Sequence, residues 1–472
     1  MKGRFSTWSR MLLVLPLLAS AVVLSGCGKV TAPSYKIDLE VWGIFDDSDA
    51  YQGALSTYQR IAQSHIGAVT YRKMTADTYR EDLLSAFAEG RGPDVFLIRS
   101  SWLPLFRNLI VAAPEYEFSE KDFRDAFVDV AADDLVVDGR TYGAPISVDS
   151  LGLYYNKNLL NAAGIATPPL TWDELETDIK LLNSVDYYGN IRQSGVALGT
   201  SKNINRSTDI LMAMAEQRGI RTLRDGFRDD VDVSSEPMRQ AMSYYAGFAS
   251  IGSERYSWNA DQHYSIDAFS EGNLAMMMNY SWQVDAIRKK NAKLNFGVAP
   301  LPQIRGAAPA NFANYWVFVV AKDRKAPSTD QKTKTFPDGK YNDIRAHESW
   351  QFLHYLAFPH PGNAFVLRNA LMTDSSAQVE VKEDPAATIL ARTGQPAARR
   401  DLITEQRKDP WLAPFAYGNL IAKGWRVGDT ESAEQILSDA IESVNRGETA
   451  LQQALSAAFS QLSQQQRRLP GD

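Results

Sequence analysis

The reactive and aromatic side chains of this chain favour stacking on another molecule over catalysis. The 472 residues include ten tryptophans, and Phe, Trp and Tyr together make up 11% of the sequence. Many of these aromatic residues are interleaved with polar ones, a pattern that suits a surface that stacks on another molecule. The sequence has no Gly-x-Ser-x-Gly, Walker loop, Gly-x-Gly-x-x-Gly or His-Glu-x-x-His. The common catalytic motifs are therefore missing.

Metal and cofactor sites are not indicated either. The five histidines are scattered, and the spacing of His347, His354 and His360 is not a zinc signature. Residues 46–49 (Asp-Asp-Ser-Asp) lack the glycine and the distant glutamate of a calcium loop, and a helix N-terminus accounts for them better. We expect no cofactor and no metal. Because any two of the 56 acidic residues could meet in space, a carboxylate pair for glycoside hydrolysis stays open.

The only cysteine, Cys27, ends a segment typical of a secretion signal. Basic residues are followed by an apolar run over 11–24 and then by Leu-Ser-Gly-Cys, which resembles the lipobox of bacterial lipoproteins. A membrane span would need about 20 apolar residues, and an ordinary signal peptide would not place a cysteine after its cleavage site. The resemblance implies a signal peptide over 1–26, a tether over 27–34, lipidation of Cys27, and attachment to the extracytoplasmic face of the cell membrane.

Charge and length restrict the remaining classes. Residues 1–26 carry three basic and no acidic residues, so their removal leaves 446 residues and changes the formal net charge from −6 to −9. A chain this acidic is not suited to coating nucleic acid. A single cysteine allows no intramolecular disulfide, so stability must come from burial. A chain of this length predicts at least two domains.

Strand and helix patterns alternate over the first part of the mature chain. Residues 36–42 alternate with their apolar side chains on one face, which predicts a strand. Helices are expected over 49–64 and 77–88, the second capped by Gly90, and strands over 69–71 and 94–98. This order predicts a parallel sheet with crossover helices. Later patterns predict strands over 151–155 and 316–321, a helix that starts with a capping box of Thr171 and Glu174, a polar surface insertion over 328–342, and helices over 431–445 and 449–464.

A series of motifs lies in order along the chain and covers most of its mature part. They are Gly92–Phe96 (Gly-Pro-Asp-Val-Phe), Pro145–Lys157 (ending Leu-Tyr-Tyr-Asn-Lys), Asn161–Leu175 (with Thr-Trp-Asp-Glu-Leu), Phe269–Met276 with Tyr280–Trp282, and Gly394–Arg399. Together they resemble motifs of extracellular solute-binding proteins of ABC importers, the sugar-binding group above all. Two features depart from the pattern: Tyr280 and Ser281 precede the tryptophan, and residues 96–102 contain no acidic residue. Specificity for maltose is therefore not implied.

The resemblance implies an α/β, two-lobed periplasmic-binding-protein-like fold with a ligand cleft between lobes that several hinge crossings join. We expect lobe I over 35–146 and 298–368, and lobe II over 147–297 and 369–464. Ligands of α/β sheets lie at the carboxyl ends of strands, and clefts between domains are favoured pockets. Both arguments place the ligand site between the lobes.

Six residues are the candidates for ligand binding, and each has a structural alternative. Trp282 matches the stacking position of the motif and Asp149 its acidic position, where a tryptophan face stacks on a sugar ring and a carboxylate accepts hydrogen bonds from hydroxyls. The alternatives are a core position for Trp282 and a structural bond at the hinge for Asp149. The remaining candidates are Trp42, Asp94, Arg399 and Trp411; the alternatives are core packing, a turn, or a contact that pins the lobes.

Three function classes follow from these observations. The first is a lipid-anchored binding protein that captures a small solute, in particular a carbohydrate, and delivers it to the permease subunits of an ABC importer. The second is a secreted lipoprotein enzyme acting on glycosides, which the missing motifs disfavour. The third is a surface solute sensor on the same fold. We expect the first, without enzymatic activity.

Overall fold

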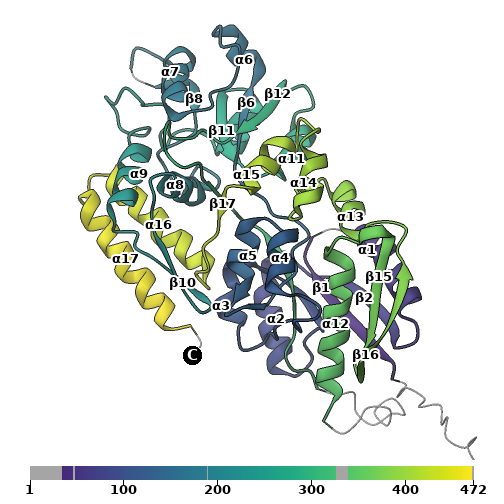
Figure 1. The fold of residues 1–472 in the computed structure, drawn as a ribbon. Coiled ribbons are helices and arrows are strands. Elements are labelled where there is room, and N and C mark those ends of the chain that lie inside the picture. The colour runs from purple at the N-terminus through teal and green to yellow at the C-terminus, as the bar shows by residue number, and fades with distance from the viewer. Residues whose placement is uncertain (1–34, 46–47, 189, 326–338, 470–472) are drawn as a thin grey trace, which may run out of the picture. The chain divides into compact units, whose positions relative to one another are not determined.

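The computed structural model describes residues 35–45, 48–188, 190–325 and 339–469. The predicted signal peptide and tether, with Cys27, and most of the predicted surface insertion lie outside the described residues. Tyr35–Asp472 form one compact unit. Its buried hydrophobic side chains fall into two clusters, and we call the parts of the chain that build them lobe I and lobe II. Figure 1 shows the elements of both lobes by label.

Lobe I is built on a four-stranded sheet with the order β14-β3-β1-β2. Strand β1 pairs in parallel with β2 and β3, and β14 pairs antiparallel with β3. The predicted alternation of strands and helices is thus confirmed in this part of the chain. The elements of lobe I are β1 (Ile37–Gly43), α1 (Ser48–Ile61), β2 (Ile66–Lys73), α2 (Tyr79–Ala88), β3 (Val95–Arg99), α3 (Leu103–Phe106), α4 (Glu120–Ala126), α5 (Asp129–Leu135), β4 (Val136–Val137), β5 (Arg140–Thr141), β14 (Trp316–Val320), α12 (Tyr341–Ala357), β15 (Ala364–Asn369), β16 (Met372–Glu380), α13 (Pro385–Thr393) and α14 (Arg400–Gln406).

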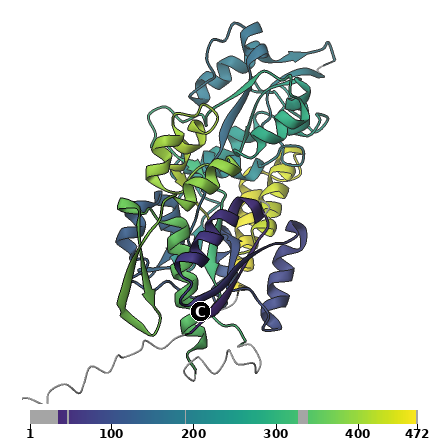
Figure 2. The ribbon, with the colours of Figure 1, turned by 90° about the vertical axis from the view of Figure 1, so that its right-hand side faces the viewer.

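Lobe II contains a five-stranded sheet with the order β12-β6-β11-β8-β7. Helices α16 and α17, both predicted, pack against each other in this lobe (Figures 1 and 2). The elements of lobe II are β6 (Gly152–Asn156), α6 (Lys157–Ala162), α7 (Trp172–Leu182), β7 (Ser184–Val185), β8 (Ile191–Val196), α8 (Ser207–Glu216), β9 (Thr222–Asp225), β10 (Arg228–Val231), α9 (Glu236–Ala246), α10 (Ser265–Glu271), β11 (Leu274–Asn279), α11 (Gln283–Lys290), β12 (Phe296–Pro300), β13 (Asn311–Phe312), α16 (Thr430–Asn445) and α17 (Leu451–Arg467). Helix α15 (Ala413–Asn419) and strand β17 (Ala422–Lys423) contact both lobes, because Ala416 and Ala422 belong to the buried cluster of lobe I and Phe415 to that of lobe II.

Residues close together in the sequence determine the start of α7 and the end of α2. The Thr171 hydroxyl accepts a hydrogen bond from the Glu174 backbone N–H at 3.3 Å, which is the predicted cap of α7. The Glu174 carboxylate accepts from the backbone N–H of Leu170 at 2.9 Å, so the second bond of the capping box is made one residue earlier than in the standard pattern. Gly90, just beyond α2, has a φ of 68°, the conformation that favours glycine after a helix.

The chain crosses between the lobes at three places. Val148 belongs to the buried cluster of lobe I and Leu151 to that of lobe II, and the chain returns between Phe312 and Ala313. The third crossing lies within residues 403–425. The first two crossings lie side by side, because the Asn314 N–H donates to the carbonyl of Asp149 at 3.0 Å. Asp149 therefore lies on the segment that joins the lobes.

Two segments belong to lobes other than those expected from the sequence. Residues 298–312 pack in lobe II, because β12 pairs with β6 of its sheet. Residues 369–403 pack in lobe I, because α13 lies against α1 and α12. The expected boundaries differ from the observed ones because β12 pairs with β6 and α13 packs on α1, and both of these partners lie more than 100 residues away along the chain.

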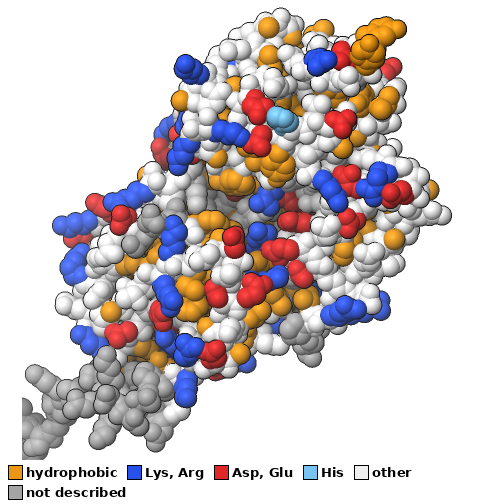
Figure 3. All heavy atoms as spheres, turned by 180° about the vertical axis from the view of Figure 1, so that it is seen from behind, with side chains coloured by type: hydrophobic (Ala, Val, Ile, Leu, Met, Phe, Trp, Pro, Cys, Tyr) orange, Lys and Arg blue, Asp and Glu red, His pale blue; other side chains and the backbone are white. Residues whose placement is uncertain are grey.

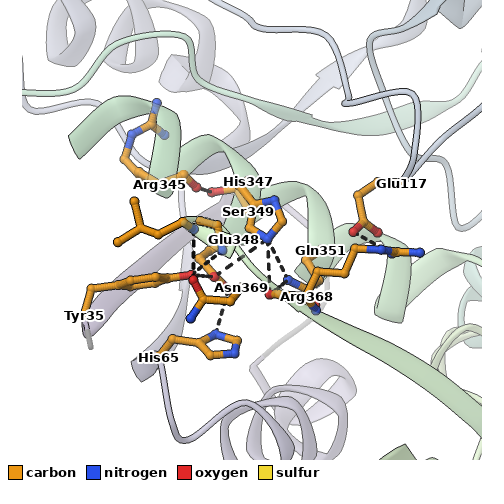
Figure 4. Close-up of polar contacts among 12 residues, drawn as sticks. Tyr35, His65, Glu117, Arg345, His347, Glu348, Ser349, Gln351, Arg368 and Asn369 are labelled. Carbon is orange, nitrogen blue, oxygen red and sulfur yellow. Dashed lines mark hydrogen bonds and ion pairs between the residues drawn. The ribbon is translucent and has the colours of Figure 1, made fainter. Parts of the chain in front are cut away.

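A buried polar cluster fixes the start of the described chain to α12 (Figure 4). The Tyr35 hydroxyl donates to the fully buried carboxylate of Glu348 and accepts from the Ala370 N–H at 2.9 Å. His65 contacts the second carboxylate oxygen of Glu348 through Nδ1 at 3.1 Å. These contacts tie β1, α12 and the turn after β15 together, directly after the segment predicted to be a tether.

Among the helices of the described residues, none combines the length and the apolar character that a bilayer crossing requires.

Candidate functional site

A cleft with a volume of about 450 Å³ lies between the two lobes. Lobe I contributes residues from the ends of β1, β3 and β14, and lobe II contributes residues before α8, after β11 and at the start of α16. The crossing segments add Asp149 and Asn314. On the face shown in Figure 3, hydrophobic, basic and acidic side chains meet around a hollow.

Aromatic rings lie on both sides of this cleft. On the side of lobe II, Trp282 lies directly after β11 and is 49% exposed, unlike most aromatic residues of the chain. On the side of lobe I, Phe45 is 38% exposed and contacts the edge of Trp316, with 5.3 Å between the ring centroids. A ligand between the lobes can therefore contact an aromatic ring of each.

Asp149 is held rigidly beside Trp282. One of its carboxylate oxygens accepts from the Ser150 N–H at 2.9 Å. The other accepts from the Ser281 N–H at 2.9 Å and from the Ser281 hydroxyl at 2.7 Å. Burial raises the pKa of Asp149 to about 7, although these hydrogen bonds and the charge of Arg206 oppose the rise. The oxygen that accepts from Ser150 can still accept from a ligand, because each carboxylate oxygen carries two lone pairs and this one uses a single lone pair.

Charged side chains from both lobes lie in the same cleft. Arg99 ends β3 in lobe I, and Arg206 precedes α8 in lobe II. Glu431, in the first turn of α16, also lines the cleft, and its neighbour Glu434 lies behind it. Burial and the nearby Asp209 raise the pKa of Glu434, and the two arginines oppose this shift. None of these four residues was among the six candidates from the sequence.

The structure places Trp42 and Asp94 outside the cleft. Trp42 is 5% exposed, and its indole N–H donates to Glu40 at 2.8 Å. Because successive side chains of a strand point to opposite faces of the sheet, a place near the end of β1 does not by itself bring Trp42 to the cleft. Ile44 and Phe45, beyond the end of β1, line the cleft instead. Asp94 is fully buried and forms ion pairs with Arg324 and Arg345. Its role in this structure is a bond between the sheet and the chain after β14.

Arg399 and Trp411 also lie away from the cleft. Arg399 is 2% exposed and donates to the carboxylates of Asp384 and Asp401 at 2.6 and 2.7 Å. Trp411 packs against Phe296, and Arg288 lies 4.0 Å from the centroid of its ring. The Gly394–Arg399 motif nevertheless reaches the cleft through Gln395 and Pro396. Of the six candidates, Asp149 and Trp282 are the two that line the cleft together, and their role in ligand binding stays a prediction.

The histidines and acidic residues do not gather into a metal site among the described residues. Trp258 is fully buried in lobe II. Trp316 lines the cleft, as does Trp102, which is 4% exposed. The sequence signal for Trp316 was its position at the start of an apolar strand, which did not distinguish a cleft residue from a core residue.

The family follows from a comparison with known proteins. Residues 56–359 match the family described as bacterial extracellular solute-binding protein, which is more than half of the chain. The chain belongs to this family. Solved structures of sugar-binding proteins share the fold. The cyclic α-maltosyl-1,6-maltose binding protein of Arthrobacter globiformis superposes with a TM-score of 0.70 over 92% of this chain and 99% of that chain, at 18% identity.

Curated relatives in this family are similar over part of their length. A protein of Brucella abortus that is named as a binding protein is 26% identical over 230 residues, which are 48% of this chain and 53% of the relative. The maltotriose-binding protein of Pyrococcus abyssi is 26% identical over 223 residues, which are 46% of this chain and 44% of the relative. The chain thus spans about half the length of the curated relatives it matches.

Proposed function

We propose that this protein captures a carbohydrate in the cleft between its lobes and delivers it to the permease subunits of an ABC importer. The observation that carries the proposal is the half-exposed ring of Trp282 beside the carboxylate of Asp149. Trp282 would stack on the C–H face of a sugar ring, and Asp149 would accept hydrogen bonds from its hydroxyls. The maltotriose-binding relative and the solved maltose-type neighbours support this class of ligand.

A lipid anchor would keep the binding protein close to the permease that it supplies. Cys27 and the residues before it supply the anchor in this proposal, through the lipobox pattern of the sequence. Several acyl chains on one cysteine are enough for stable attachment, because one chain is marginal and two suffice. The protein would then work at the extracytoplasmic face of the cell membrane. The buried contacts of Tyr35 fix the folded domain to the end of such a tether.

A thermal-shift screen of the purified mature chain tests the proposed function. The screen compares neutral mono- and oligosaccharides, polyols, amino acids and short peptides. We expect one or more carbohydrates to raise the melting temperature and to be recovered unchanged after incubation. Stabilisation by peptides or amino acids alone would reject carbohydrate capture. Hydrolysis of a bound glycoside, followed by chromatography, would favour the enzyme alternative.

A further inference from the structure

Four charged side chains from the two lobes meet where the cleft adjoins a smaller pocket: Arg99, Arg206 and Glu431 line the cleft, and Glu434 lines the pocket behind it. We call these four residues the charged quartet. Arg99 Nη1 lies 3.6 Å from Glu431 Oε1 and 3.9 Å from Glu434 Oε1. Arg206 Nη1 lies 3.9 Å from Glu434 Oε1. All three distances exceed the 2.7–3.2 Å of an N–H···O hydrogen bond. The opposite charges of the quartet are therefore neighbours without direct hydrogen bonds.

The guanidinium groups of the quartet retain hydrogen-bonding capacity. Nε and Nη1 of Arg99 and Nε of Arg206 are buried and donate no hydrogen bond. Aromatic rings hold both cations instead: Arg99 lies 5.6 Å from the ring centroids of Trp102 and Trp316, and Arg206 lies 5.8 Å from that of Trp282. Unpaired buried donors are costly, and a bound molecule with acceptor groups would remove that cost.

The backbone at Arg206 is consistent with a position held for binding. Its φ of 63° and ψ of 29° lie in the left-handed region, which is rare for a long side chain. Such conformations persist where the surrounding structure fixes them, and they gather at ligand sites. At the start of α8, this backbone conformation directs the guanidinium of Arg206 between Trp282 and Glu434.

We propose that the charged quartet binds hydroxyl groups of an uncharged carbohydrate and disfavours phosphorylated or acidic solutes. This inference rests on the proposed function and names the ligand class of the same cleft. A hydroxyl accepts a hydrogen bond and donates one, so one hydroxyl can accept from an arginine and donate to a glutamate of the quartet. A fully ionised phosphate or carboxylate accepts only, and it would meet the carboxylates of Glu431 and Asp149 in the cleft, with Glu434 behind them.

The quartet also couples the ligand to both lobes. Arg99 belongs to lobe I, whereas Arg206, Glu431 and Glu434 belong to lobe II. Glu431 is also bound from lobe I by Arg80, whose Nη1 lies 3.0 Å from its second carboxylate oxygen. A hydroxyl that bridges Arg99 and Glu431 would therefore join the lobes at the point where they already approach each other.

Isothermal titration calorimetry with matched probes tests the inference. The probes are four neutral trisaccharides (maltotriose, cellotriose, mannotriose and xylotriose) and two anions (trigalacturonate and sn-glycerol 3-phosphate). We expect at least one neutral trisaccharide to bind and neither anion to bind. The tightest trisaccharide should bind at least tenfold more weakly to Glu431→Gln and to Glu434→Gln, two changes that keep the side-chain shape. Glu448→Gln, which removes the same charge from lobe II outside the cleft, should change affinity less than twofold.

Three outcomes of this experiment would overturn the inference. Tighter binding of an anion than of every neutral probe would overturn the inference. Unchanged affinity of the trisaccharide for both glutamine variants would also overturn it, but the proposal that the cleft binds a carbohydrate would survive. Failure of all six probes would overturn the inference together with the choice of carbohydrate as ligand. Melting curves of the ligand-free variants keep a folding defect from being mistaken for lost contacts.

Discussion

Replacing Trp282 by alanine tests whether this residue is a stacking platform for the ligand or a core residue that stabilises the fold. A tryptophan buries roughly 150–250 Å² when it is fully covered, and Trp282 is 49% exposed, so about 100 Å² is left for a ligand. At about 25 cal/mol per Å², covering that area with a sugar ring contributes about 2.5 kcal/mol. Trp282→Ala should therefore weaken binding of the carbohydrate found by the screen by at least about 2 kcal/mol, which is typical of a binding anchor.

The same substitution should have a limited effect on folding. Truncation of a fully buried tryptophan costs about 3–5 kcal/mol of unfolding free energy, and half of that contact gives about 1.5–2.5 kcal/mol for Trp282. Trp258, fully buried in the same lobe, is the matched control and should show the larger loss. Urea melts of the ligand-free variants and calorimetric titrations measure both quantities. Equal loss of stability in the two variants, or unchanged sugar affinity in Trp282→Ala, would refute the assignment of Trp282 as a platform.

Three further predictions concern anchoring, motion and pH. Cys27→Ala should leave folding of the mature domain unchanged and abolish lipid attachment, and labelling of that variant by a fatty-acid analogue would contradict the lipobox interpretation. Small-angle scattering should show a smaller radius of gyration with the bound carbohydrate, because binding proteins of this kind close by a hinge; an unchanged radius with a tight ligand would exclude closure. Because the pKa of Asp149 is raised to about 7 and a ligand hydroxyl donates to its ionised form, affinity should rise about tenfold from pH 6 to pH 8. Asp149→Asn should bind more weakly, by about 1.5–3 kcal/mol at pH 8, and lose this rise, so that any rise left in the variant comes from Glu434, whose pKa is also raised; an undiminished tenfold rise in the variant would refute the role of Asp149.

Local patterns in the sequence predict the scaffold of the site well. The alternation over β1, the helical spacing of α2 and the cap of α7 depend on residues close together in the chain, and each element is confirmed. Asp149 and Trp282 could be predicted because they lie in the motifs Pro145–Lys157 and Tyr280–Trp282, and the structure places both in the cleft. Their assignment depended on the resemblance of these motifs to those of a family and not on local patterns alone.

The remaining parts of the site depend on contacts that local patterns do not contain. Asp94 finds its partner Arg324 across 230 residues, which turns a plausible cleft carboxylate into a buried ion pair. Arg99 and Glu431 lie 332 positions apart, and each by itself is typical of a solvated surface residue. Trp42 and Trp316 are both tryptophans at strand ends, and the sheet face that each side chain occupies decides which one reaches the cleft.

A crystal structure of the mature chain with the carbohydrate selected by the thermal-shift screen tests the central claim most directly. We expect electron density for a sugar ring on the face of Trp282, with a hydroxyl within hydrogen-bond distance of the Asp149 carboxylate and with both lobes in contact with the ligand. Density for the carbohydrate at another surface, or in the cleft without contact to Trp282 and Asp149, would contradict it.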